Sequence, residues 1–157
     1  MTQATALVIR EAQEADLPAV LELYAQPEID DGQKLDLDAA REIFRRFQRY
    51  PSYRLYVAEC GGAVLGSYAL LVMDNLGHLG ASSAIVEDVV VAPDLHGQGI
   101  GQAMMRRAME QAREQGCYKL VLSSNAKRQR AHAFYDALGF TRHGVSFLID
   151  LNQADAP

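Results

Sequence analysis

Residues 89–101 read Val-Val-Val-Ala-Pro-Asp-Leu-His-Gly-Gln-Gly-Ile-Gly. The valines end the run Ser83–Val91, which is almost fully apolar outside Glu87 and Asp88 and therefore predicts a buried strand. Glycines after Pro93 allow the backbone to turn tightly and to approach a ligand closely. The first N–H groups of the helix that follows have no partner within the helix, and the helix dipole adds positive charge there. The junction therefore predicts a pyrophosphate site made of main-chain donors.

The spacing of these glycines separates the junction from two other nucleotide-binding loops. A Rossmann loop carries Gly-x-Gly-x-x-Gly, whereas Gly97–Gly101 reads Gly-x-Gly-x-Gly. A P-loop ends in Gly-Lys-Ser or Gly-Lys-Thr, which Ile100-Gly101-Gln102 does not supply. A glycine triplet can also make a plain corner between a strand and a helix, and the spacing alone leaves that alternative open.

The chain before the junction predicts one strand, two helices and a hairpin. Asp16 and Pro18 are typical of a helix start, and a second helix is expected to begin near Asp36 or Asp38 and to end before Pro51. The remaining elements are a strand at Ala6–Arg10 and a hairpin of Tyr53–Glu59 and Val64–Val72, joined at Gly61-Gly62.

The chain after the junction predicts a long helix to about Gln115, with Gly116 as its cap. Its buried face consists, by spacing, of Met104, Met105, Ala108 and Ala112. We then expect a strand at Lys119–Leu122, a helix at Arg130–Leu138, strands at Phe140–His143 and Ser146–Leu151, and a frayed tail at Asn152–Pro157. These elements predict an α/β (α+β) fold, with a mixed central sheet and helices on both faces, in a single domain over residues 1–151.

Composition excludes several classes of protein. The 157 residues carry a net charge of −5, whereas nucleic-acid binders usually present a basic face. The chain has no apolar run of membrane-spanning length, and its N-terminus lacks the pattern of a secretory signal. Its two cysteines form no Cys-x-x-Cys pair, so that we expect no metal site and a cytoplasmic protein with reduced thiols.

Two separated motifs carry a resemblance to a known family. His96-Gly97-Gln98-Gly99-Ile100-Gly101 is similar to Gln/Arg-x-x-Gly-x-Gly/Ala, with His96 in the leading position, and Ala133–Phe140 contains Phe-Tyr-x-x-x-Gly-Phe. With the element order over Ala6–Leu151, the chain resembles the GNAT superfamily of N-acetyltransferases. The resemblance implies a V-shaped cleft between the strand ending at Val91 and the strand at Lys119–Ser124. The pantetheine arm of acetyl-CoA would lie in this cleft as an added strand.

The resemblance also implies which residues hold acetyl-CoA. They are Val89, Val90, Val91, His96, Gly97, Gln98, Gly99, Ile100, Gly101, Gln102, Asn125 and Tyr135. The backbone N–H of Val89 or Val90 would polarise the thioester carbonyl. Asn125 has an alternative role as an ordinary loop residue.

Acetyl transfer to an amine also needs a base and a proton for the thiolate that leaves. Alternation places Glu87 and Asp88 on opposite faces, which favours Glu87 in the cleft because it shares parity with Val89 and Val91. A β-bulge would reverse that choice, and either acid can instead be an edge charge. Tyr135 matches the family tyrosine that can protonate the sulfur, with core packing beside Phe134 and Phe140 as the alternative.

The acceptor is the least defined part of the prediction. Glu87–Val91 with Gly116–Leu120 resembles glucosamine-6-phosphate N-acetyltransferases, and Leu122–Tyr135 resembles aminoalkylphosphonate N-acetyltransferases more closely. A basic cluster, Lys127, Arg128 and Arg130, could hold a phosphate of the coenzyme or of the acceptor, but a solvated surface is the better default for such a charge run. We therefore expect a small-molecule amine to attack acetyl-CoA directly in a ternary complex.

Alternative functions are a protein or peptide acetyltransferase, a non-catalytic module that binds coenzyme A, and a structural protein that shares the fold. The partners expected are the small-molecule amine and, as in much of the family, a second copy in a homodimer, with neither nucleic acid nor membrane.

Overall fold

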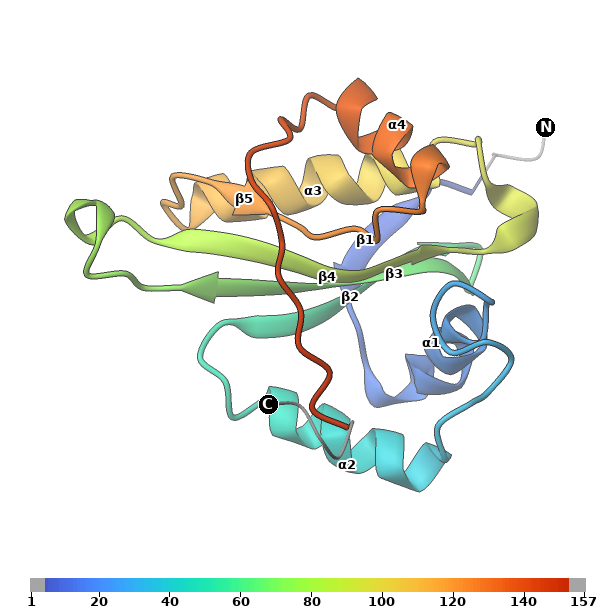
Figure 1. The fold of residues 1–157 in the computed structure, drawn as a ribbon. Helices are drawn as coiled ribbons and strands as arrows, with labels where there is room; N and C mark the ends of the chain where they lie inside the picture. Colours follow the sequence, from blue (N-terminus) through green and yellow to red (C-terminus); the bar gives the residue numbers. More distant parts are fainter. Residues whose placement is uncertain (1–4, 153–157) are drawn as a thin grey trace. The chain divides into compact units, whose positions relative to one another are not determined.

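Five strands form one sheet in the order β1-β2-β3-β4-β5 in the computed structural model, which describes residues 5–152 (Figure 1). The strands are β1 (Val8–Glu11), β2 (Tyr53–Cys60), β3 (Ala63–Met73), β4 (Ser83–Val91) and β5 (Leu120–Val121). The first four pair antiparallel, and β4 pairs parallel with β5. The predicted mixed sheet is therefore confirmed.

Helices cover both faces of this sheet, as predicted. Helices α1 (Leu17–Tyr24) and α2 (Leu37–Phe47) lie on one face and α3 (Ile100–Glu114) lies on the other (Figure 1). The first face buries apolar residues of both helices and of the sheet, namely Ala12, Leu17, Val20, Ala40, Leu55, Val57 and Ala69. On the second face α3 buries the four predicted residues, Met104, Met105, Ala108 and Ala112.

Helix α3 lies unusually close to β3 at one glycine. A Cβ built on Gly66 would lie 2.8 Å from Sδ of Met104, so that only glycine permits this approach. Farther along, the buried hydroxyl of Tyr68 donates a hydrogen bond of 2.7 Å to Oε1 of Gln111. These contacts fix α3, and with it the glycine corner at the start of α3, against the middle of the sheet.

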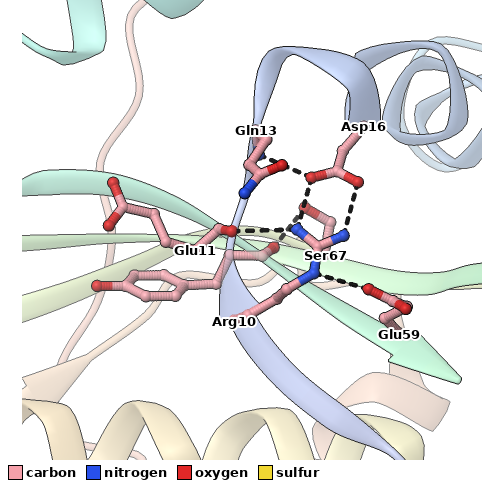
Figure 2. Close-up of polar contacts among 7 residues, drawn as sticks. Arg10, Glu11, Gln13, Asp16, Glu59 and Ser67 are labelled. Atoms are coloured by element: carbon pink, nitrogen blue, oxygen red, sulfur yellow. Dashed lines mark hydrogen bonds and ion pairs between the residues drawn. The ribbon is translucent and has the colours of Figure 1, made fainter. Parts of the chain in front are cut away.

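Arg10 joins three elements on the edge of the sheet (Figure 2). Its guanidinium donates two hydrogen bonds of 2.8 Å to the carboxylate of Asp16, in the short helix before α1, and one of 2.7 Å to Glu59 on β2. Asp16 precedes α1 as predicted, but its side chain does not cap that helix. It accepts instead from Arg10 and from the backbone N–H of Gln13.

The chain divides into two compact units, with the boundary in the sequence between Leu122 and Ser123. The second unit contains helix α4 (Gln129–Ala137), which ends before Gly139 at a φ of 92°. The predicted strands Phe140–His143 and Ser146–Leu151 are wrong, because the structure has no strand in either segment. Residues 141–152 are exposed and no ladder of hydrogen bonds pairs them, so that alternation alone does not make a strand there.

Two further differences concern the ends of elements. Strand β5 spans two residues rather than the predicted Lys119–Leu122, because its pairing with β4 stops at Val121. Most of the predicted frayed tail, residues 153–157, lies outside the described residues. Within the part of the chain that the structure describes, no helix combines the length and apolarity that crossing a membrane requires.

Candidate active site at the bulge of β4 and the glycine corner

A β-bulge interrupts β4 at the two acids. Ala69 of β3 pairs with Glu87 and Ser67 pairs with Val90, so that two residues of β4, Asp88 and Val89, lie opposite a single residue of β3. Asp88 adopts the left-handed conformation, with φ at 52°, which aspartate tolerates better than most residues. The bulge breaks the alternation of the strand. Alternation therefore does not separate Glu87 from Asp88, and both side chains are exposed.

Beyond the bulge, β4 presents an open edge. Strand β5 pairs with β4 only at Ala84 and Ile85, and β4 continues to Val91. The backbone N–H of Ala92 donates to Leu65 of β3, and the groups of successive residues in an antiparallel ladder point to alternate sides. The main-chain N–H and C=O of Val91 therefore point away from β3, toward the edge that β5 leaves open.

Two side chains already contact this edge. Nε2 of Gln26, in the loop after α1, donates a hydrogen bond of 2.9 Å to the carbonyl oxygen of Val91. Nε2 of His96 lies 3.1 Å from the same oxygen. His96 thus contacts its own strand, where the family pattern has glutamine or arginine. Its contact tightens the corner between β4 and α3.

The glycine corner exposes the start of α3. Gly97 and Gly99 have φ of 79° and 83°, a conformation that favours glycine, and a Cβ on either would meet no atom within 4 Å. Helix α3 begins at Ile100, and its N-cap residue, Gly99, has no side chain that could bind the first N–H groups. These donors and the positive end of the helix dipole suit a diphosphate.

The residues at the start of α3 differ in what they can offer a ligand. Ile100 is buried, so that its side chain belongs to the core and only its backbone is available to the corner. Gln98 and Gln102 are exposed and can add side-chain donors. Within residues 5–152, no group of three or more histidine, cysteine, aspartate or glutamate side chains is placed to hold a metal ion.

The comparison with known proteins decides the family. The sequence model described as "Acetyltransferase (GNAT) family" matches residues 17–140, most of the chain. This chain belongs to the GNAT acetyltransferase family. A glucosamine 6-phosphate N-acetyltransferase of Trypanosoma brucei brucei is 30% identical over 96% of this chain and 100% of its own length. An aminoalkylphosphonate N-acetyltransferase of Salmonella typhimurium is 32% identical over 73% of each chain.

A solved structure supports the same assignment. A putative acetyltransferase from Agrobacterium tumefaciens superposes with a TM-score of 0.84 at 30% identity, over 91% of this chain and 99% of that one. The fold predicted by resemblance is thereby confirmed. The protein is a GNAT N-acetyltransferase, an acyltransferase whose named relatives act on small amines.

The two acids of this acetyltransferase hold their protons more strongly than ordinary carboxyls. Both residues are reached by solvent, yet the surrounding protein partly desolvates their carboxyl groups. This partial burial, and next the charge of Asp88, raise the pKa of Glu87. Partial burial, and next the charge of Asp30, raise the pKa of Asp88. A carboxylate with a raised pKa is the stronger base, because it binds a proton more tightly and therefore accepts one more readily from an amine.

Two tyrosines that sequence reasoning missed lie within electrostatic reach of these acids. Burial, and next Asp88, raise the pKa of Tyr24, at the end of α1, and the same two causes with Glu87 raise that of Tyr53 on β2. The hydroxyl of the fully buried Ser67 interacts with Tyr24 and donates a hydrogen bond of 2.9 Å to the carbonyl of Tyr56. No local pattern marks these residues, because contacts between distant segments bring them together.

The second unit of the acetyltransferase holds the other predicted residues. Tyr135 lies between Phe134 and Phe140, with ring centroids 5.1 and 5.6 Å away, and burial raises its pKa. Both the packing role and the acid role of Tyr135 are compatible with this setting. Asn125 has a local task, because its Oδ1 accepts from the N–H of Lys127 at 2.9 Å in the turn before α4. Lys127 and Arg130 are exposed, and Arg128 is half-buried.

Proposed function

We propose that this acetyltransferase moves the acetyl group of acetyl-CoA to the primary amine of a small molecule, by direct attack in a ternary complex. The observation that carries the proposal is the arrangement of β4. The part of β4 that β5 leaves unpaired extends from the acids at the bulge to the glycine corner of α3, and there the Val91 carbonyl already has side-chain partners, Gln26 and His96. The edge can pair with the amide-bearing arm of the coenzyme, while the corner binds its diphosphate.

Bound acetyl-CoA would supply an activated acyl carbon with a thiolate leaving group, and the residues of the chain supply the remaining steps. Glu87 accepts the proton of the amine, directly or through water, because partial burial and next the charge of Asp88 raise its pKa and so its basicity. Main-chain N–H groups at Val89 or Val90 polarise the thioester carbonyl. Tyr135 donates a proton to the sulfur.

The wider setting of the enzyme follows from the family and from composition. We propose that the enzyme works in the cytoplasm, as a homodimer, without nucleic-acid or membrane partners. The net charge of −5 disfavours a nucleic-acid partner. Sedimentation of the purified protein measures the oligomeric state.

The base assignment is tested by release of free thiol from acetyl-CoA with a panel of amines, for Glu87→Gln and Asp88→Asn. We expect Glu87→Gln to lower kcat/KM about 100-fold near pH 7. The deficit should shrink toward pH 10, where an alkyl amine, with a pKa of about 10.4, deprotonates on its own.

Asp88→Asn provides the comparison. Loss of its charge lowers the pKa of Glu87, so that the acid limb of the pH profile should move to lower pH. A Glu87→Gln enzyme with an unchanged profile would contradict the role of Glu87. Absence of thiol release with every amine, in protein that binds acetyl-CoA, would instead favour a non-catalytic coenzyme-binding module.

A further inference from the structure

Two side chains of the chain itself bind one carbonyl oxygen on the edge of β4. Nε2 of Gln26 donates to the oxygen of Val91 at 2.9 Å, and Nε2 of His96 lies 3.1 Å from the same atom. Because a carbonyl only accepts, His96 bonds to it through a protonated Nε2. A carbonyl oxygen has two lone pairs, so that these side chains use its full capacity. A further N–H donor can bind this oxygen only if one of them leaves.

An added strand would use this same oxygen. Val91 pairs with Gly66 of β3, and its carbonyl points away from β3, as the bond from the N–H of Ala92 to Leu65 requires. Strand β5, the neighbour of β4 on that side, pairs with it no farther than Ile85. The amide-bearing arm of the coenzyme, lying along this edge, would therefore bring an N–H donor to an oxygen that is already fully bonded.

Of the two donors, Gln26 is the one placed to leave. His96 follows Val91 after a short turn, five positions along the chain. A hydrogen bond of 3.0 Å from the N–H of Leu95 to the carbonyl of Ala92 closes that turn. Gln26 lies 65 positions from Val91, and its side chain rotates about three bonds. Its amide can therefore turn to water without disturbing β4.

The side-chain bond of Gln26 also attaches a folded turn to β4. The carbonyl of Gln26 accepts the N–H of Asp31 at 3.2 Å, and the N–H of Gly32 donates to the carbonyl of Ala25 at 2.7 Å. These bonds fold residues 25–32 into a compact turn directly after α1. Release of the Gln26 amide from β4 would therefore loosen this turn as a unit.

We propose that Gln26 takes the place of the coenzyme's amide on Val91, and that acetyl-CoA displaces it and thereby loosens the loop between α1 and α2. The inference rests on the proposed binding of acetyl-CoA along β4 and gives Gln26 a positioning role at that site. Gln26 lowers the affinity for the coenzyme, since its bond must break first. It also couples arrival of the coenzyme to the segment that leads into α2.

Calorimetric titration tests the competition with two ligands, acetyl-CoA and 3′-phospho-ADP, which keeps the phosphates of the coenzyme without its amide arm. We expect Gln26→Leu to bind acetyl-CoA about fivefold more tightly than the wild type, the effect of one net hydrogen bond, and 3′-phospho-ADP within about twofold of it. Gln26→Met, a second variant without the donor, should behave alike. Gln33→Leu, the same change at an exposed glutamine of the same loop, is the matched control and should leave both affinities unchanged.

Hydrogen–deuterium exchange measures the loop itself. The N–H groups of Asp30, Asp31 and Gly32 are hydrogen-bonded within the turn and should be protected in the wild type without ligand. Saturating acetyl-CoA should speed their exchange about fivefold, whereas 3′-phospho-ADP should not. In Gln26→Leu their exchange should be fast from the start, with little further effect of acetyl-CoA.

The outcomes separate the inference from the proposed function. Unchanged or weaker binding of acetyl-CoA by correctly folded Gln26→Leu overturns the inference and leaves acetyl transfer intact, as does unchanged or slower exchange of the loop when acetyl-CoA binds. An equal gain in affinity for 3′-phospho-ADP also overturns it, because Gln26 would then not compete with the arm. Wild-type protein that neither binds acetyl-CoA nor releases thiol contradicts the proposed function itself, and the displacement of Gln26 then fails with it.

Discussion

Asp88 is the residue on which the geometry of the site depends. Its left-handed conformation accompanies the bulge opposite β3, and the charges of Asp88 and Glu87 add to burial in raising the pKa of Tyr53 on β2. From the sequence alone, only the alternation of side chains along the strand is available at this point. It assigns the two acids to opposite faces of the sheet. The possibility of a bulge was foreseeable, but its presence depends on pairing with β3.

Tyr135 provides a prediction at the same scale. If it protonates the departing sulfur, Tyr135→Phe should lower kcat about 100-fold, within the range of general acid catalysis, and should change the Kd for acetyl-CoA less than about threefold. The ring remains, so that packing against Phe134 and Phe140 is retained. Steady-state kinetics and titration calorimetry measure the two effects. Equal loss of turnover and affinity would assign Tyr135 a binding role instead.

At the scale of elements, the ion pair between Arg10 and Asp16 ties β1 to the start of α1. Hydrogen bonds from Arg10 lower the pKa of Asp16, and burial, the second cause, raises it. The net effect is a pKa below the ordinary value of 3.8. A lowered pKa means that the folded state holds ionised Asp16 preferentially. Its stabilisation is therefore present above pH 4 and disappears as the pH falls through the folded-state value.

Replacing Asp16 by asparagine tests this tie. We expect the free energy of unfolding at pH 7 to fall by about 2 kcal/mol, the range for hydrogen bonds to charged groups. The wild-type protein should lose that advantage at a second pH, below the lowered folded-state pKa of Asp16, so that the two urea-unfolding curves converge there. Asp38→Asn is the control, because its 88%-exposed side chain pairs with Arg41 at the surface and should matter little. Curves that stay equally far apart at both pH values would contradict the ion-pair account.

Most elements of the first unit were predictable within one or two residues, for local reasons. Asp36 caps α2 by accepting from two N–H groups, and Gly116 ends α3 with φ at 73°. What stayed unpredictable depends on contacts between distant segments. Examples are the use of Asp16 by Arg10 instead of α1, the bulge at Asp88, and the bond from Gln26 to Val91.

At the scale of the whole molecule, we propose a cofactor region that follows the family pattern and an acceptor region that no motif marks. The glycine corner could be predicted because the spacing of its glycines and the helix that follows are local features of the sequence. The family assignment over residues 17–140 agrees with that prediction. The acceptor region depends on how a loop after α1 returns to β4, which no motif records. The prediction of two strands near the C-terminus is wrong for a related reason. The alternation of apolar residues in Val145–Leu151 does not specify a partner strand.

Calorimetric titration of acetyl-CoA into Gly99→Asp tests most directly whether main-chain donors at the glycine corner bind the diphosphate. We expect the affinity to fall at least about 100-fold relative to the wild type, because the new carboxylate repels the diphosphate at close range. Gly99→Asn, which keeps the shape without the charge, should lose less, and Gly77→Asp, in an exposed loop, should bind normally. Wild-type affinity in a correctly folded Gly99→Asp protein would show that the coenzyme is held elsewhere.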